Sequence, residues 1–117
     1  MESKIIVKQL AALAQDTRLA IFRLLVVQGP QGMAVGKIAE QLQVAPATLS
    51  FHLKELCNSG LIQARQESRF IYYSADFAAM TALLGFLSEN CCNGNRCDAS
   101  AAAAQPCDSL STPNEFD

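Results

Sequence analysis

Apolar residues recur along this chain at intervals of three and four, in four short segments before residue 60 and in one after residue 75. Such spacing is typical of amphipathic helices. We expect helices over 5–14, from Asp16 or Thr17 to the stop at Gly29, over 35–43, over 46–58 and from Asp76 to about Ser88. Two runs rich in strand formers separate the last two, and they predict a β-hairpin of 61–65 and 69–74 around 66–68. The sequence thus predicts a mainly α fold with a small β-hairpin (α+β).

Capping and stop residues agree with these boundaries. Asp16 or Thr17 suits the N-cap of the second helix, and Asp76 suits that of the fifth. Pro46 suits the first turn of the fourth helix, and Gly60 fits the left-handed residue that ends it. The order helix, short turn, helix, hairpin is that of a winged helix-turn-helix.

Charge is distributed unevenly along the chain. Residues 1–88 carry eight bases and six acids, whereas 89–117 carry five acids and one base. A mildly basic body can bind phosphate although the net charge is −2. We expect a winged helix-turn-helix DNA-binding and dimerisation domain over 1–89 and a flexible, cysteine-containing tail over 90–117. No signal peptide or membrane-length apolar run is apparent, so we expect a cytoplasmic protein with no membrane partner.

The predicted helix 46–58 has two unlike faces. Leu49, Leu53 and Leu56 form its core stripe. The opposite face carries side chains suited to DNA: Ala47, Thr48, Ser50, Phe51 and Lys54. We expect the two hydroxyls to bond base edges or phosphates, the phenyl ring to contact a thymine methyl, and the ammonium to bind phosphate.

Two arginines bracket the tip of the predicted hairpin. From there Arg65 and Arg69 could reach the DNA backbone or enter a minor groove. The alternative interpretation is an ordinary pair of helices, with Phe51 in the core or in a protein interface. The pattern of residues favours DNA reading but leaves both open.

Three segments of the chain are distinctive: Leu-Ala-Ala-Leu-Ala-Gln-Asp-Thr-Arg-Leu at 10–19, Ala-Pro-Ala-Thr-Leu-Ser-Phe-His-Leu-Lys-Glu-Leu at 45–56 and Ser-Gly-Leu-Ile at 59–62. Through these segments, residues 9–80 resemble the ArsR/SmtB family of metal-responsive repressors. From Ser50 to Leu61 the chain follows the family pattern Ser-x-His-Leu-x-x-Leu-x-x-x-Gly-Leu. The resemblance implies a homodimer built from the first and fifth helices, a palindromic double-stranded operator, and derepression by an inducer ion.

The chain departs from that family where an inducer site is often found. Arsenic repressors of the commonest type carry Cys-x-Cys at the start of the third helix, but Met-Ala-Val-Gly-Lys-Ile at 33–38 has no cysteine. The single histidine, His52, lies in the predicted reading helix. A histidine-rich zinc site at the dimer helix is therefore not expected either.

Four of the five cysteines lie in the last 27 residues. Cys91 and Cys92 are adjacent, and an Asn-Gly turn signal can fold Cys97 back toward them. Three converging thiolates suit a soft ion, so we expect As(III) as inducer, or Sb(III) or a methylated arsenical. Arg96 next to Cys97 would favour thiolate.

Other interpretations of these cysteines remain open. Cys107 could complete a four-sulfur zinc or cadmium site. The vicinal pair could instead be a thiol-redox switch, or the cysteines could be incidental to the tail. Cys57, near the end of the fourth predicted helix, is most simply a partly buried structural residue.

The sequence does not predict an enzyme or an organic cofactor. It shows no recognisable Ser/His/Asp set, phosphate-cradling glycine loop or catalytic carboxylate pair. A metal-buffering protein would also use a cluster of cysteines. The helix-turn-helix pattern argues against it, because a buffer has no need of an outward face like that of Thr48 and Phe51.

Overall fold

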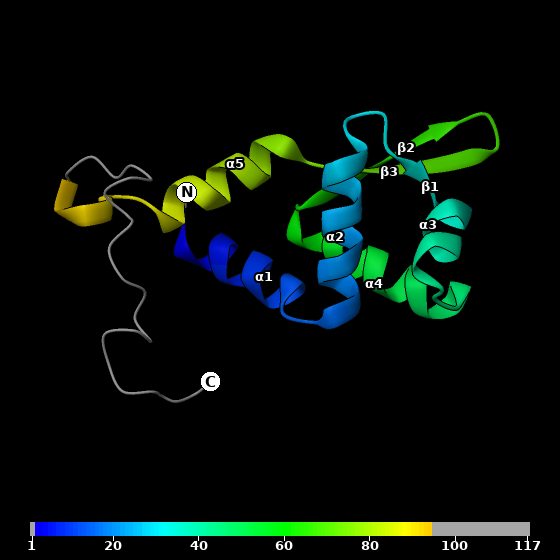
Figure 1. Cartoon of the computed structure of the whole chain (residues 1–117), viewed down its shortest axis with the longest axis horizontal. Helices are drawn as coiled ribbons and strands as arrows, with labels where there is room; N and C mark the ends of the chain where they lie inside the picture. The colour runs from blue at the N-terminus through cyan, green and yellow to red at the C-terminus, as the bar shows by residue number, and fades with distance from the viewer. Residues whose placement is uncertain (1, 95–117) are drawn as a thin grey trace. The chain divides into compact units, whose positions relative to one another are not determined.

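A computed structural model of the chain describes residues 2–94 (Figure 1). The elements follow one another as α1 (Ser3–Leu13), α2 (Asp16–Gln28), β1 (Met33–Ala34), α3 (Val35–Leu42), α4 (Pro46–Ser59), β2 (Ile62–Glu67), β3 (Phe70–Ala75), α5 (Phe77–Leu87) and the short 3-10 helix η1 (Cys91–Gly94). The contacts separate the residues up to Leu87, called the body below, from those that start at Ser88. The five predicted helices and the hairpin are confirmed.

The sheet has three antiparallel strands in the order β1-β3-β2. β2 pairs with β3 from Ile62 opposite Ala75 to Glu67 opposite Phe70. The hairpin turn is therefore Ser68-Arg69, and the expected turn at 66–68 is wrong by two residues, because residues 66 and 67 still pair with β3.

The two-residue strand β1 is an addition that the sequence did not predict. Met33 pairs with Tyr73 and Ala34 with Tyr72. Gly32 makes this approach possible, since its φ is +78° and a Cβ there would lie 2.6 Å from the carbonyl oxygen of Tyr73. The chain between α2 and α3 is thereby fastened to the hairpin.

The core is built around α4, which packs against α1, α2, α3 and β2. Leu49, Leu53 and Leu56 are at most 2% exposed, so the predicted core stripe is confirmed. Other elements contribute fully buried side chains to the same cluster: Ile21, Leu25, Ile38 and Leu61. One face of α4 is therefore fixed by apolar packing, which leaves its opposite face outside.

Two of the three predicted helix caps hold. The Oδ1 of Asp76 accepts the Ala79 N–H at 3.0 Å, as expected for the cap of α5. Gly60 ends α4 in the left-handed conformation, with φ +87°. The cap of α2 is instead Gln15, whose side-chain Oε1 accepts the Arg18 N–H at 3.0 Å, so the expectation of Asp16 or Thr17 is wrong.

The helix α2 is not buried on all sides, since Leu19 is 43% exposed. This side chain lines an apolar groove of about 430 Å³ between α2 and α5, together with Phe22, Met80 and Leu83. The groove arises because α2 packs on the core along one side only. Among residues 2–94 no helix has the length and apolarity needed to cross a membrane.

Candidate nucleic-acid interface

The chain turns sharply between α3 and α4. Gln43 adopts the left-handed conformation, with φ 55° and ψ 50°, and the Val44 N–H donates to the Ala39 carbonyl at 3.2 Å. Ala45 is extended, and Pro46 stands in the first turn of α4, as predicted. A helix, a tight turn and a second helix are thus in place.

The residues predicted to read DNA are all exposed along α4. They are Ala47, Thr48, Ser50, Phe51 and Lys54, called the reading face below. The phenyl ring of Phe51 is 56% exposed, so the alternative that it belongs to the core of the body is wrong. Their exposure follows from the leucine stripe, because a helix that buries one face must turn the other to solvent.

The first turn of α4 has no side-chain cap. The backbone N–H groups of Ala47 and Thr48 therefore lack intrahelical acceptors. They stand at the positive end of the helix dipole, beside the Thr48 hydroxyl. This end of α4 suits a phosphate oxygen.

Sequence reasoning missed the surroundings of His52. Its ring is 8% exposed, and Nδ1 lies 3.2 Å from Nη1 of Arg18. Burial, and then the Arg18 charge, lower the pKa of His52, while Glu55 acts in the opposite direction. The only available signal was its spacing, since His52 lies three residues after Leu49 and four before Leu56 and so falls on their face.

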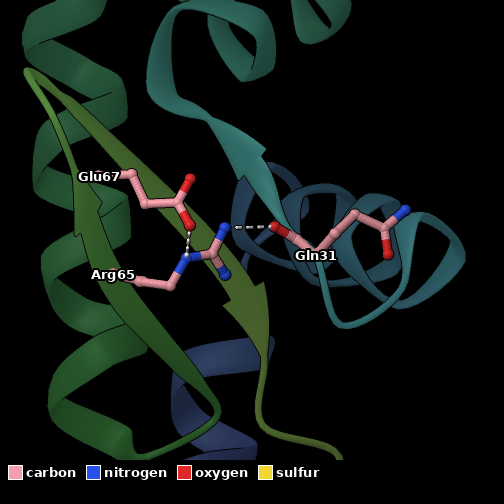
Figure 2. A network of polar contacts seen from close by, with 3 residues as sticks. All are labelled: Gln31, Arg65 and Glu67. Carbon is pink, nitrogen blue, oxygen red and sulfur yellow. Dashed lines mark hydrogen bonds and ion pairs between the residues drawn. The ribbon is translucent and has the colours of Figure 1, made fainter.

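Arg65 lies within β2, three residues before the hairpin turn (Figure 2). Its Nη2 donates to the Gln31 carbonyl at 3.0 Å and its Nε to Glu67 Oε2 at 3.1 Å, and the guanidinium lies 5.2 Å from the Tyr72 ring centroid. The side chain is thus engaged within the body, although it keeps N–H donors for phosphate. Arg69 lies in the turn itself and is exposed.

Sequence reasoning also passed over Lys37. It is exposed on the first turn of α3, within the helix-turn-helix. With Lys54 and Arg69 it adds to the positive charge carried by the helix-turn-helix and hairpin. No strong signal marked it, because an isolated exposed lysine is common on helix surfaces.

The vicinal cysteines lie beyond the body, in η1. Their Sγ atoms are 3.5 Å apart, and Cys91 is half-buried while Cys92 is exposed. Cys92 and Asn93 have left-handed backbone conformations, and the Gly94 N–H donates to the Asn90 carbonyl at 3.3 Å, so the turn predicted at Asn-Gly is present. Cys97 and Cys107 lie outside the described residues. Within 2–94 there is no cluster of three or more His, Cys, Asp or Glu side chains suited to a metal ion.

Cys57 fits its prediction as a structural residue. It is half-buried on α4, and this burial raises the pKa of its thiol. Burial and the Cys57 thiol in turn raise the pKa of Tyr73. A thiol held in its protonated form is a poor ligand for a soft ion.

Comparisons with known proteins agree with this architecture. A family model described as a helix-turn-helix domain matches residues 13–63. The chain is 38% identical over 77 residues to the HTH-type transcriptional regulator YceK of Bacillus subtilis, covering 65% of this chain and 76% of YceK. It is 35% identical over 71 residues to a homologue of the cadmium resistance transcriptional regulatory protein CadC from Staphylococcus aureus, covering 61% of this chain and 57% of that protein. It thus spans less than two thirds of the CadC homologue.

Solved structures show the same fold. The homodimeric winged helix-turn-helix domain of Mb0332 from Mycobacterium bovis, described as a possible ArsR-family transcriptional regulator, superposes with a TM-score of 0.59 at 29% identity. The match covers 82% of this chain and 89% of that domain. These relatives are named as transcriptional regulators, which confirms that the chain is not an enzyme. It is a DNA-binding protein of the ArsR/SmtB family of winged helix-turn-helix transcriptional regulators.

Proposed function

We propose that this regulator is a homodimeric repressor, which releases its operator when trivalent arsenic binds to Cys91, Cys92 and Cys97. The observation that carries the inducer assignment is the 3.5 Å separation of the Cys91 and Cys92 Sγ atoms. Sb(III) and methylated arsenicals share the same thiophilic chemistry and belong to the same proposal.

DNA recognition is assigned to the reading face and the hairpin. Thr48 and Ser50 bond base edges or phosphates, and Phe51 packs against a thymine methyl group in the major groove. Lys54 and Arg69 contact phosphates and so supply affinity without sequence preference. Arg65 contributes to the backbone contact with the donors that Gln31 and Glu67 leave available.

The dimer is assigned to α1 and α5. Both helices expose large apolar side chains at 40–63% of their surface: Ile5, Val7, Leu10, Leu84 and Leu87. Large exposed apolar side chains are common at interaction surfaces, and the Mycobacterium bovis relative is described as homodimeric. Two copies related by a twofold axis place two reading helices one DNA turn apart, about 34 Å.

The sulfur geometry suits one shared ion. Two thiolates that each lie about 2.3 Å from a metal cannot be more than about 4.6 Å apart, and the observed 3.5 Å meets this limit. It is also longer than the roughly 2.05 Å of a disulfide bond, so the two sulfurs are not bonded to each other. Cys97 is assigned as the third ligand, because trivalent arsenic takes three sulfurs.

Release of DNA requires that the two ligands oppose each other. Ion capture beyond α5 shifts the dimer away from the spacing that the operator needs. A coupling of about 1–3 kcal/mol is usual for such linkage, and it acts equally in both directions. Operator DNA therefore weakens ion binding by the same factor as the ion weakens DNA binding.

A truncated chain that ends at Asn90 tests the sensor directly. The operator is first isolated by selecting duplexes from a random pool with the full chain. Gel shifts with and without arsenite then compare the full and truncated chains. We expect both chains to bind the duplex, and only the full chain to dissociate from it when arsenite is added. If arsenite also releases the truncated chain, the inducer site lies elsewhere.

A second candidate inducer is zinc or cadmium held by four sulfurs including Cys107. The cadmium-regulator homologue among the relatives favours it. A Cys107→Ser variant separates the two, because a three-sulfur arsenic site keeps its response while a four-sulfur site loses it. A thiol-redox switch is separated by the oxidant diamide, which would release DNA without any ion by closing the vicinal disulfide.

A further inference from the structure

Arg18 joins three helices of the body. Its backbone N–H is bonded to Gln15 at the start of α2. Its Nε donates to the carbonyl of Ala12 in α1 at 2.6 Å, and its Nη1 lies 3.2 Å from Nδ1 of His52 in α4. One guanidinium thus links α1 and α2 to the middle of the helix that carries the reading face.

The chemistry of this pair fixes the proton on the imidazole. A guanidinium has only donors and keeps its charge throughout the range in which proteins fold. His52 Nδ1 must therefore be the acceptor, and the ring proton must sit on Nε2. A second proton on Nδ1 would place a donor against a donor and two positive charges 3.2 Å apart.

His52 is also in contact with the reading face. Its ring meets that of the adjacent Phe51 edge to face, with centroids 5.5 Å apart and planes at 62°. Phe51 is exposed, whereas His52 is buried behind it. A shift of the imidazole therefore changes the position of a side chain that faces DNA.

We propose that Arg18 and His52 are positioning residues for DNA recognition, which hold α4 in its reading orientation only while His52 Nδ1 carries no proton. The inference rests on α4 being the reading helix. Low pH then weakens operator binding, because protonation breaks the bond between Arg18 of α2 and His52 of α4. The lowered pKa of the buried His52 supports this, since the folded body favours the neutral ring.

The charged groups around the His52 ring provide a control variant for this test. Arg18 of α2 opposes the proton, and Glu55 on α4 favours it. Lys8 of α1 lines the same cleft as Arg18 and Glu55. A Glu55→Gln variant removes an acid beside the ring but leaves the Arg18–His52 bond intact. It should keep the pH dependence and shift its midpoint to lower pH.

The test measures operator affinity of the full chain from pH 8 to pH 5 by fluorescence anisotropy, with circular dichroism at each pH to confirm the fold. Because the pKa of His52 is lowered, wild-type affinity should fall only at pH values under the ordinary histidine pKa of about 6.5, by at most about tenfold per pH unit for one linked proton. In His52→Asn, an amide oxygen replaces Nδ1 as an acceptor that cannot titrate. This variant should bind at pH 8 within a few fold of wild type and lose the pH dependence, whereas His52→Ala should bind weakly throughout.

Two results would overturn the proposal. One is a His52→Asn variant with the pH dependence of wild type. The other is equal weakness of His52→Asn and His52→Ala at pH 8, which would mean that the acceptor does not matter. Failure to select any duplex would instead contradict DNA binding itself, so the two failures are distinguishable.

Nuclear magnetic resonance on the wild-type protein gives a measurement that does not depend on the folding of a variant. The chain has one histidine, so its ring signals are unambiguous. Nitrogen shifts should show the Nε2–H form at pH 8, and operator DNA should lower the pKa further, because DNA binds the neutral form more tightly. Nearby phosphates alone would raise the pKa, so a rise on DNA binding overturns the proposal.

Discussion

The geometry of the candidate functional residues has different origins in the body up to Leu87 and in the segment that starts at Ser88. In the body, the exposure of the reading face follows from three buried leucines, because their packing fixes which face of α4 is turned to solvent. In the described part of the segment after it, residues 88–94, the vicinal cysteines lie in a short 3-10 helix with no buried residue. The proposed reading face is thus specified by the packing behind it, whereas the proposed thiol site depends on its own ligands.

The largest expected effect is on the free energy of unfolding, and it tests whether stability comes from the core of the body alone. Leu56 is fully buried, and Leu56→Ala should lower the free energy of unfolding by about 2–5 kcal/mol, since it leaves a cavity in the core. Urea denaturation followed by circular dichroism measures this. The matched Cys92→Ser should change stability by less than about 0.5 kcal/mol. Equal losses in both variants would remove the contrast between the two regions.

The next effect concerns the response to arsenite, in variants that keep the fold. In the wild-type chain, arsenite should weaken operator binding by about 5- to 150-fold. In the Cys91→Ser/Cys92→Ser double variant this effect should vanish, while affinity without arsenite stays unchanged, as measured by anisotropy. Cys57→Ser is the control and should respond normally, because its thiol belongs to the core. A double variant that still responds would exclude the vicinal pair as the sensor.

A smaller effect separates two roles on the reading face. Phe51→Ala should cost about 1 kcal/mol in operator affinity, the value of burying roughly one methyl group. Replacing the contacted thymine by uracil should cost the wild-type protein the same amount and the variant nothing further. Uracil at the other thymines serves as the control. If every thymine gives the same result, Phe51 does not read a methyl group.

The smallest effect concerns a single phosphate contact. Lys54→Gln should lower affinity for all duplexes alike and reduce the slope of log affinity against log salt by about 1. Titrations at several salt concentrations give this slope. Lys4→Gln, at an exposed site on α1, should leave it unchanged. Sequence-dependent losses in Lys54→Gln would instead assign this lysine to a base edge.

Much of the body could be predicted from the sequence, because apolar spacing is a direct record of which faces are buried. The five helices were predicted in this way, and the Gly60 stop and the Asp76 cap were predicted from residue types that suit helix ends. The strand β1 could not be, since two residues are too short for an alternating pattern and its pairing with Tyr72 and Tyr73 depends on distant chain.

Contacts between distant side chains were also beyond the sequence. Arg18 and Arg65 are merely basic in the sequence, yet one bonds His52 across 34 positions and the other bonds Gln31 across the same separation. The exposure of Leu19 depends on how α2 and α5 are placed. The thiol site stays a prediction, and the geometry is described only for Cys91 and Cys92.

The pairing of β1 with β3 has one more consequence. Together with the bond from Arg65 to the Gln31 carbonyl, it locks the hairpin to the segment that leads into α3. The hairpin and the helix-turn-helix are therefore tied together within one copy. The proposed inducer would then act mainly on the angle at which two copies meet the duplex.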